Sequence, residues 1–239
     1  MAEACGPVFL ISGGQMMRKR RGPDPLLQTV IRRTGVRRPM TSYVGTASGD
    51  DDTFQSRIAR MLQKAGAGEV TLAPLCGGRG DPKKAKTILE ASDLVFISGG
   101  DVEEGMRVLV EKEMSGFLRR LHRSGKLFLG VSAGSIMLAR KWVRWRDPHN
   151  DENAERFSCL GLAPVLCDTH GEGDGWEELK ALLALSPTGA IGYGITSGAA
   201  LVVEPDRTLS ALGGEVDRFR RRANGVVPIK GLVPEKSAR

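Results

Sequence analysis

A serine between two glycines is the part of this sequence best suited to covalent chemistry. Ser132 stands in the middle of Gly130-Val131-Ser132-Ala133-Gly134, after the apolar run Lys126 to Leu129 and before the helical stretch Ser135 to Ala139. Glycines on both sides permit a sharp turn, and the N-terminus of the following helix offers free N–H groups to an oxyanion. A serine that only caps the helix is the alternative, but a cap alone does not require both glycines. The pattern predicts that Ser132 is a nucleophile.

A serine nucleophile needs a general base, and the chain has three histidines. His122 lies among arginine and leucine on a predicted helix, which indicates a solvated residue. His149 lies in a charged stretch and is kept as a reserve candidate. His170 follows the apolar run Ala163 to Cys167 and precedes the glycine-rich segment Gly171 to Gly175, so we expect it where a strand ends in a loop. We therefore predict that His170 is the base.

Two aspartates compete for the acid that would orient this base. Asp168 is two residues before His170 and would share its face on an extended strand. Asp147 lies instead in the polar segment after the serine turn. The residues alone leave the choice between these two acids open.

Backbone N–H groups near the serine would hold the oxyanion of an acyl-transfer reaction. The pair Gly99-Gly100 ends another apolar run, Phe96 to Ser98, and Ala133 directly follows the serine. The N–H groups of these three residues form a candidate oxyanion hole. A plain strand-to-helix turn is an equally good interpretation of the glycine pair.

Short apolar runs alternate with amphipathic stretches along the chain. The strands and helices that they predict must position the site residues. The runs predict buried parallel strands and the stretches predict helices, one of which begins at Asp81-Pro82. One long apolar stripe extends from Met106 to Leu121, and Arg144 to Arg156 is expected to form a loop beside the site. Ala199 to Val203 and Thr208 to Leu212 predict an antiparallel hairpin. The strand candidates are Val8 to Ser12, Ser42 to Ala47, Glu69 to Leu72, Leu94 to Ser98 and Leu127 to Val131.

The β-α-β order indicates an α/β fold with a mostly parallel central sheet. The 239 residues, of which 41% are hydrophobic, suit a single domain over residues 1–239. Four scattered cysteines without Cys-x-x-Cys spacing indicate reduced, structural thiols. The first residues lack a basic region, and their apolar run is too short for a signal sequence or a membrane span. We therefore expect a cytoplasmic protein.

The net charge of +7 raises the question of a polyanionic partner. Basic residues concentrate at Arg18 to Arg21, Arg32-Arg33 and Arg37-Arg38. Nucleic-acid binding is not expected, because these clusters carry almost no aromatic side chains on which bases could stack. A solvated face is the favoured interpretation, and attraction of an acidic substrate or an anionic surface is the alternative.

Five segments together carry a family resemblance. They are Ile11 to Gly14, Gly45 to Gly49, Ile97 to Asp101, Gly130 to Gly134, and Leu160 to Leu162 leading to Asp168-Thr169-His170. In this order they resemble the serine peptidase family S51, which contains α-aspartyl dipeptidase (peptidase E) and cyanophycinase. The resemblance implies a class I glutamine amidotransferase-like fold, a flavodoxin-like three-layer sandwich.

The resemblance also implies roles for the site residues. The family pattern would make Ser132 the nucleophile, His170 the base, and Gly99 or Gly100 with Ala133 the oxyanion hole. It favours Asp147 as the acid and leaves Asp168 in reserve. The implied function is that of a serine-type peptidase, which hydrolyses a small peptide through an acyl-enzyme and uses no metal or organic cofactor. We expect no nucleic-acid or membrane partner, and a homodimer stays open.

Two departures from the family pattern bear on function. No acidic pair stands at Ile195 to Gly198, and the acidic segment Gly171 to Glu178 replaces the spaced arginines of cyanophycinase-like members. The acidic segment favours a basic or neutral substrate over an α-aspartyl one. The missing pair motivates a second hypothesis, a catalytically degenerate binding or regulatory member of the fold. Glutamine amidotransfer and an ordinary α/β-hydrolase esterase are less favoured, because no cysteine stands in the serine turn and the histidine is far from the C-terminus.

Overall fold

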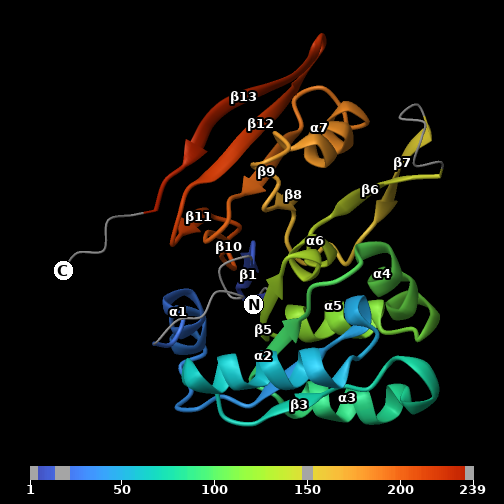
Figure 1. Cartoon of the computed structure of the whole chain (residues 1–239), viewed down its shortest axis with the longest axis vertical. Helices are drawn as coiled ribbons and strands as arrows, with labels where there is room; N and C mark the ends of the chain where they lie inside the picture. Colours follow the sequence, from blue (N-terminus) through green and yellow to red (C-terminus); the bar gives the residue numbers. More distant parts are fainter. Residues whose placement is uncertain (1–4, 14–21, 147–152, 235–239) are drawn as a thin grey trace.

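A computed structural model describes residues 5–13, 22–146 and 153–234 of the chain. Its main feature is a seven-stranded sheet in the order β11-β10-β1-β5-β4-β2-β3 (Figure 1). Five neighbouring strands, β1, β5, β4, β2 and β3, are parallel, and β10 and β11 continue the sheet antiparallel. The strands are β1 Val8–Ile11, β2 Thr41–Val44, β3 Val70–Leu72, β4 Leu94–Ile97, β5 Leu127–Val131, β10 Ala200–Val203 and β11 Leu209–Leu212.

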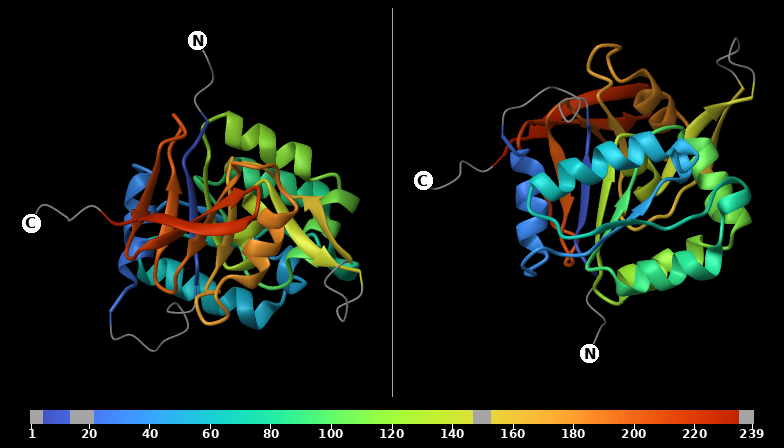
Figure 2. Two further views of the ribbon diagram at one scale, coloured as in Figure 1. Left: turned by 90° about the horizontal axis from the view of Figure 1, so that it is seen from above. Right: turned by 60° about the horizontal axis from the view of Figure 1, so that its bottom comes forward.

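Helices cover both faces of this sheet and give three layers (Figure 2). Alternate side chains of β1 point to opposite faces, as the period of a strand requires. Phe9 and Ile11 pack in one apolar cluster with α1 Pro25–Arg33 and α2 Asp52–Lys64. Val8 and Leu10 belong to the other, larger cluster. That cluster includes residues of α3 Pro82–Ala91, α4 Val102–Glu111, α5 Ser115–Arg123 and α6 Ala133–Leu138.

Aspartates cap several of these helices at their first turn. Asp81 precedes Pro82 at the start of α3, and its carboxylate accepts from the N–H groups of Lys83 and Lys84 at 3.0 Å. Pro82 fits the first helical position, where an N–H would have no partner inside the helix. The start of this helix at Asp81-Pro82 is therefore confirmed. Asp24 and Asp101 cap α1 and α4 in the same manner.

A second, four-stranded sheet in the order β13-β12-β9-β8 lies beside the sandwich (Figure 1). β8 and β9 are parallel, whereas β12 pairs antiparallel with β9 and β13. Helix α7 Glu177–Ala184 packs against this sheet through Leu179 and Leu183. The strands are β8 Leu166–Thr169, β9 Ile191–Ile195, β12 Val216–Arg222 and β13 Gly225–Leu232.

Three local expectations differ from the structure. The stripe from Met106 to Leu121 spans two helices, because Glu113 adopts a left-handed φ of 54° between them. The expected loop from Arg144 to Arg156 is shorter at both ends, because its first and last residues belong to an antiparallel pair, β6 Lys141–Trp145 and β7 Ala154–Ser158. Residues 147–152 lie outside the described part. His122 is buried rather than solvated. Its Nε2 lies 2.8 Å from the Gly6 carbonyl oxygen, and its ring packs edge-on against Phe128.

The hairpin and the free cysteines expected from the sequence are found in the structure. β10 and β11 form the antiparallel hairpin expected from Ala199 to Leu212. The four cysteines are free thiols, and burial raises the pKa of Cys159 to about 12. Within the described ranges, the structure has no helix that is both long enough and apolar enough to cross a membrane.

Candidate active site

The turn that carries Ser132 joins β5 to α6 and is held in a strained conformation. Ser132 has φ 53° and ψ −124°, values that few residues other than glycine adopt. Its N–H donates to the carbonyl of Ile11 on β1 at 2.9 Å, which anchors the turn to the middle of the sheet. A Cβ on Gly134 would lie 2.2 Å from the Ile97 carbonyl oxygen, and one on Gly130 would lie 2.6 Å from backbone atoms of Gly134. The two flanking glycines are therefore required by backbone packing.

His170 stands where β8 ends, and its imidazole faces Ser132. Its N–H donates to Ile195 at 3.0 Å, and its own φ of 48° turns the chain out of the strand. The Oγ of Ser132 and the Nε2 of His170 are 2.9 Å apart. With the proton of the neutral imidazole on Nδ1, Nε2 accepts from the serine hydroxyl. This is the arrangement that a general base needs to take the serine proton.

Trp176 holds the segment that follows His170. Its indole is buried and Nε1 donates to Asp217 at 2.9 Å, while its N–H donates to the carbonyl of Gly171 at 2.8 Å. A Cβ on Gly194 would lie 2.6 Å from the indole, so only glycine at that position of β9 leaves room for the ring. The loop is thus closed on itself and bound to the second sheet.

Backbone donors lie beside the serine. The N–H groups of Gly99, Gly100 and Ala133 donate to no protein group in the part of the chain that the structure describes. A Cβ on Gly99 would lie 3.2 Å from the Cβ of Ser132, so this glycine is in direct contact with the turn. Gly100 has φ 140° and passes so close to Ala47 that no side chain would fit. An oxyanion hole requires backbone donors without a protein partner, and these N–H groups meet that condition.

The acid of the site is not settled by geometry. Asp168 lines the same cavity as His170, but its Oδ1 accepts from the N–H of Thr169 at 2.6 Å. No hydrogen bond joins it to His170 among the described residues. Asp168 is the third residue of β8, whereas His170 leaves the strand with a φ of 48°. Burial raises the pKa of Asp168 to about 7. Asp147, the favoured acid, lies outside the described residues.

Two glutamates not proposed from sequence are close enough to act electrostatically with His170. Glu172 accepts from the N–H of Ser197 at 3.0 Å. Burial raises the pKa of Glu172, but the bond from Ser197 and the charge of His170 outweigh it, so the net pKa is lowered. Burial raises the pKa of Glu178, which lines the cavity. Glu172 thus brings a carboxylate to Ser197, where the sequence lacks the expected acidic pair. Its position two residues after His170 was the available signal.

A cavity of about 430 Å³ opens over Ser132 and His170. Trp142, Trp145 and Phe157 on β6 and β7 form an aromatic wall that sequence reasoning did not assign to the site. The aromatic and β-branched residues Trp142, Val143 and Trp145, which are common in strands, were the available signal there. The guanidinium of Arg144 is paired with Glu155 at 2.6 Å and with Glu103 at 3.1 Å. The further carboxylates Asp101, Asp168 and Glu178 make the lining acidic.

No cluster of three or more histidine, cysteine, aspartate or glutamate side chains that could hold a metal ion occurs within residues 5–13, 22–146 and 153–234. The groups that the described residues bring together at the site are a hydroxyl, an imidazole, carboxylates and backbone donors. A hydroxyl in a strained strand-to-helix turn with an imidazole in contact is the arrangement found in α/β proteins that carry out acyl transfer on serine.

Comparison with known proteins identifies the family of the chain. It matches the model of Peptidase family S51 over residues 8–210 and therefore belongs to that family. It is 26% identical over 199 residues to the cyanophycinase of Nostoc sp., which covers 79% of this chain and 65% of that protein. It is 29% identical over 192 residues to peptidase E of Streptomyces coelicolor, covering 75% and 74% of the two chains. The chain thus spans about two thirds of the length of the cyanophycinase it matches.

A solved structure of a peptidase from an acI-B1 Actinobacterium has the same fold. It superimposes with a TM-score of 0.69 at 16% identity, covering 98% of this chain and 97% of that one. The likeness concerns the fold. The α/β sandwich expected from the sequence is confirmed, and it is of the class I glutamine amidotransferase-like type with a C-terminal antiparallel hairpin.

Proposed function

We propose that this chain is a serine-type peptidase that cleaves a small peptide through an acyl-enzyme on Ser132. The observation that carries the proposal is the 2.9 Å contact between the Oγ of Ser132 and the Nε2 of His170, made from a strained turn next to free backbone donors. Membership of Peptidase family S51 and the relatives named cyanophycinase and peptidase E support the same activity. The acidic lining of the cavity favours a substrate without a negative charge beside the scissile bond.

The geometry supports the following sequence of steps. The Nε2 of His170 takes the hydroxyl proton while the Oγ of Ser132 bonds to the peptide carbonyl carbon, and the carbonyl oxygen becomes an oxyanion. The N–H groups of Ala133 and of Gly99 or Gly100 bind this oxyanion. The imidazolium then gives its proton to the leaving amine, and the C–N bond breaks. A water molecule attacks the ester with His170 again as base, which releases the acid and restores Ser132.

The identity of the acid is part of the proposal. Asp147 is kept as the family-implied acid and Asp168 as its reserve. A pKa of about 7 makes Asp168 only half ionised near neutral pH, which weakens it as a partner for an imidazolium. Glu172 is a third carboxylate, and its lowered pKa keeps it charged.

The test is hydrolysis of a dipeptide library by purified protein and by Ser132→Ala. We expect the variant to lose at least about a thousandfold in kcat/KM, because the nucleophile is gone while the fold is kept. Peptide hydrolysis that survives Ser132→Ala unaltered would show the assignment to be wrong. A fluorophosphonate probe separates the alternative of a degenerate binding or regulatory protein, since only an activated serine is labelled efficiently. A cytoplasmic location remains part of the proposal and is tested by cell fractionation.

A further inference from the structure

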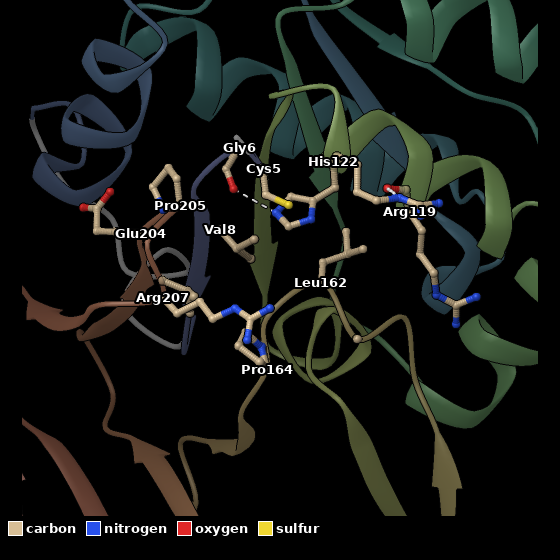
Figure 3. A pocket seen from close by; sticks show the side chains of 13 residues that line it. Cys5, Gly6, Val8, Arg119, His122, Leu162, Pro164, Glu204, Pro205 and Arg207 are labelled. Carbon is tan, nitrogen blue, oxygen red and sulfur yellow. Dashed lines mark hydrogen bonds between the residues drawn. The ribbon is translucent and has the colours of Figure 1, made fainter. Parts of the chain in front are cut away.

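A second cavity, of about 300 Å³, lies at the edge of the main sheet opposite to Ser132. Figure 3 shows the side chains that line it. Val8, which lines it, is the first residue of β1, whereas Ile11 at the other end of the same strand accepts the hydrogen bond from Ser132. Val203 contributes from the end of β10. The two cavities are therefore separated by the length of the central strands.

The floor of this second cavity is apolar. Val8, Leu162 and Val203 are all buried, with exposed fractions of 1%, 6% and 3%. Pro164 and Pro205 complete the apolar lining. Side chains packed this tightly present a preformed surface to a non-polar group.

The rim of the second cavity is strongly basic. Arg119 and Arg123 reach it from α5, and Arg207 reaches it from the turn between β10 and β11. The Nε of Arg119 donates to the carbonyl of Leu160 at 2.8 Å, which fixes its guanidinium. Arg207 extends toward Pro164 in Figure 3 and makes no ion pair with any described residue.

The one carboxylate at this rim is already neutralised. Glu204 accepts from the guanidinium of Arg33 at 2.6 Å. Basic residues in the last turn of α5 complement the helix dipole, which accounts for Arg123. That effect does not account for Arg207, which belongs to another element. All three arginines line the cavity, and Glu204 is the one carboxylate among its lining residues.

His122 gives the wall of the second cavity a further polar group. Its Nε2 must carry a proton, because the Gly6 carbonyl 2.8 Å away can only accept. In the neutral imidazole, Nδ1 is therefore the unprotonated nitrogen. Burial lowers the pKa of His122, and an anion bound beside it would favour the charged form and raise that pKa.

We propose that this cavity binds a small organic anion, whose carboxylate or phosphate group is held by Arg119, Arg123 and Arg207. Its apolar body lies against Val8, Leu162 and Val203. The site is separate from the chemistry of Ser132, whose own cavity is lined by carboxylates and disfavours an anion. Guanidinium groups suit both oxyanions, since they offer paired donors in one plane.

The test uses the full chain and two probes, benzoate and phenyl phosphate. Inorganic phosphate lacks the apolar body, and benzyl alcohol lacks the charge. The chain has three histidines, so the His122 imidazole can be assigned by NMR with a His122→Gln variant. We expect saturable shifts of the His122 signals with at least one anionic probe and a raised His122 pKa in the complex. The probe that binds more tightly shows whether the site prefers a carboxylate or a phosphate group.

Variants locate the site. Arg207→Gln is expected to weaken binding about tenfold, because a charge-assisted hydrogen bond is lost. The matched control is Arg60→Gln, an exposed arginine on α2, which should bind like the parent. Ser132→Ala should also bind unchanged. The proposal is overturned if neither probe shifts His122 saturably, if Arg207→Gln and Arg123→Gln both bind like the parent, or if benzyl alcohol binds as tightly as the anions. Inorganic phosphate binding as tightly as phenyl phosphate would overturn the role of the apolar floor.

Discussion

The indole nitrogen of Trp176 donates a hydrogen bond of 2.9 Å to the carboxylate of Asp217. Trp176 is six residues after His170, and Asp217 belongs to β12 of the second sheet. The second sheet therefore supports the loop that carries the imidazole. Because the contact with Ser132 crosses from the second sheet to the main sheet, a small movement of this loop would separate the two side chains.

We expect Trp176→Phe to lower kcat for peptide hydrolysis about tenfold. The phenyl ring keeps most of the apolar packing but leaves Asp217 without its donor, which costs about 1–3 kcal/mol of unfolding free energy. Kinetics and urea unfolding measure the two effects. Asp217→Asn is the matched control, because its carbonyl oxygen still accepts from the indole, so it should resemble the parent. Full activity in Trp176→Phe would show that this bond does not position His170.

Gly134→Ala should prevent a stable native turn. Its Cβ would stand 2.2 Å from the Ile97 carbonyl oxygen, and relief requires the backbone of β4 or α6 to move. We expect a loss on the order of 3 kcal/mol in unfolding free energy, measured by thermal or urea unfolding. Gly116→Ala in α5 is the control, since the nearest atom is the end of an arginine side chain at 3.9 Å. That change should be neutral or should stabilise the helix by up to about 1 kcal/mol.

Asp168 gives the folded state a pH dependence of known sign. Its pKa is raised from 3.8 to about 7 by burial, so the folded protein holds this proton in a range where the unfolded chain has lost it. The contribution of Asp168 to stability is thus full below about pH 4 and is lost as the pH rises to about 7. Between these two pH values the unfolding free energy of the parent should decrease by on the order of 2–4 kcal/mol, and we expect Asp168→Asn to remove this decrease. Urea unfolding at pH 4 and pH 8 measures the unfolding free energy of the parent and the variant. An equal change between the two pH values in both proteins would contradict the prediction.

Glu172→Gln tests whether this carboxylate acts on His170. The amide can still accept from the N–H of Ser197, so the loop should keep its conformation. It cannot stabilise the imidazolium by charge, so we expect kcat to fall at least about tenfold with KM changed less than twofold. Glu90→Gln on α3 is a distant exposed control. An unchanged kcat in Glu172→Gln would leave Asp147 as the acid to test next by Asp147→Asn.

Much of the sandwich could be predicted because its strands are short apolar runs and its helices begin at strong caps. The serine turn was also predictable, since the glycines around Ser132 are demanded by local backbone contacts. The proximity of Ser132 and His170 depends on two strands in different sheets, and the pairing of these two residues was inferred from their types. Their catalytic roles stay a prediction that Ser132→Ala will decide.

Other features depend on tertiary contacts that leave little trace in the sequence. His122 is flanked by arginines on its helix, yet it is buried, because the Gly6 carbonyl and the Phe128 ring lie over that position. Glu113 adopts a left-handed φ at the end of α4, and no glycine at that position predicts it. The strands β6 and β7 pair across residues of mixed charge, where hydrophobic periodicity is weak. The aromatic wall of the site was missed for this reason.

The central place of β1 has a consequence for how the chain reaches its native state. Val8 pairs with Phe128 on one side and with Val203 on the other, so the N-terminal strand is completed only after nearly the whole chain is present. Contacts between such distant segments close slowly. The N–H of Ser132 donates a hydrogen bond to the carbonyl of Ile11 on the same strand. The serine should therefore acquire its reactive geometry late in folding. An intermediate with formed helices would then still be unreactive toward a serine probe.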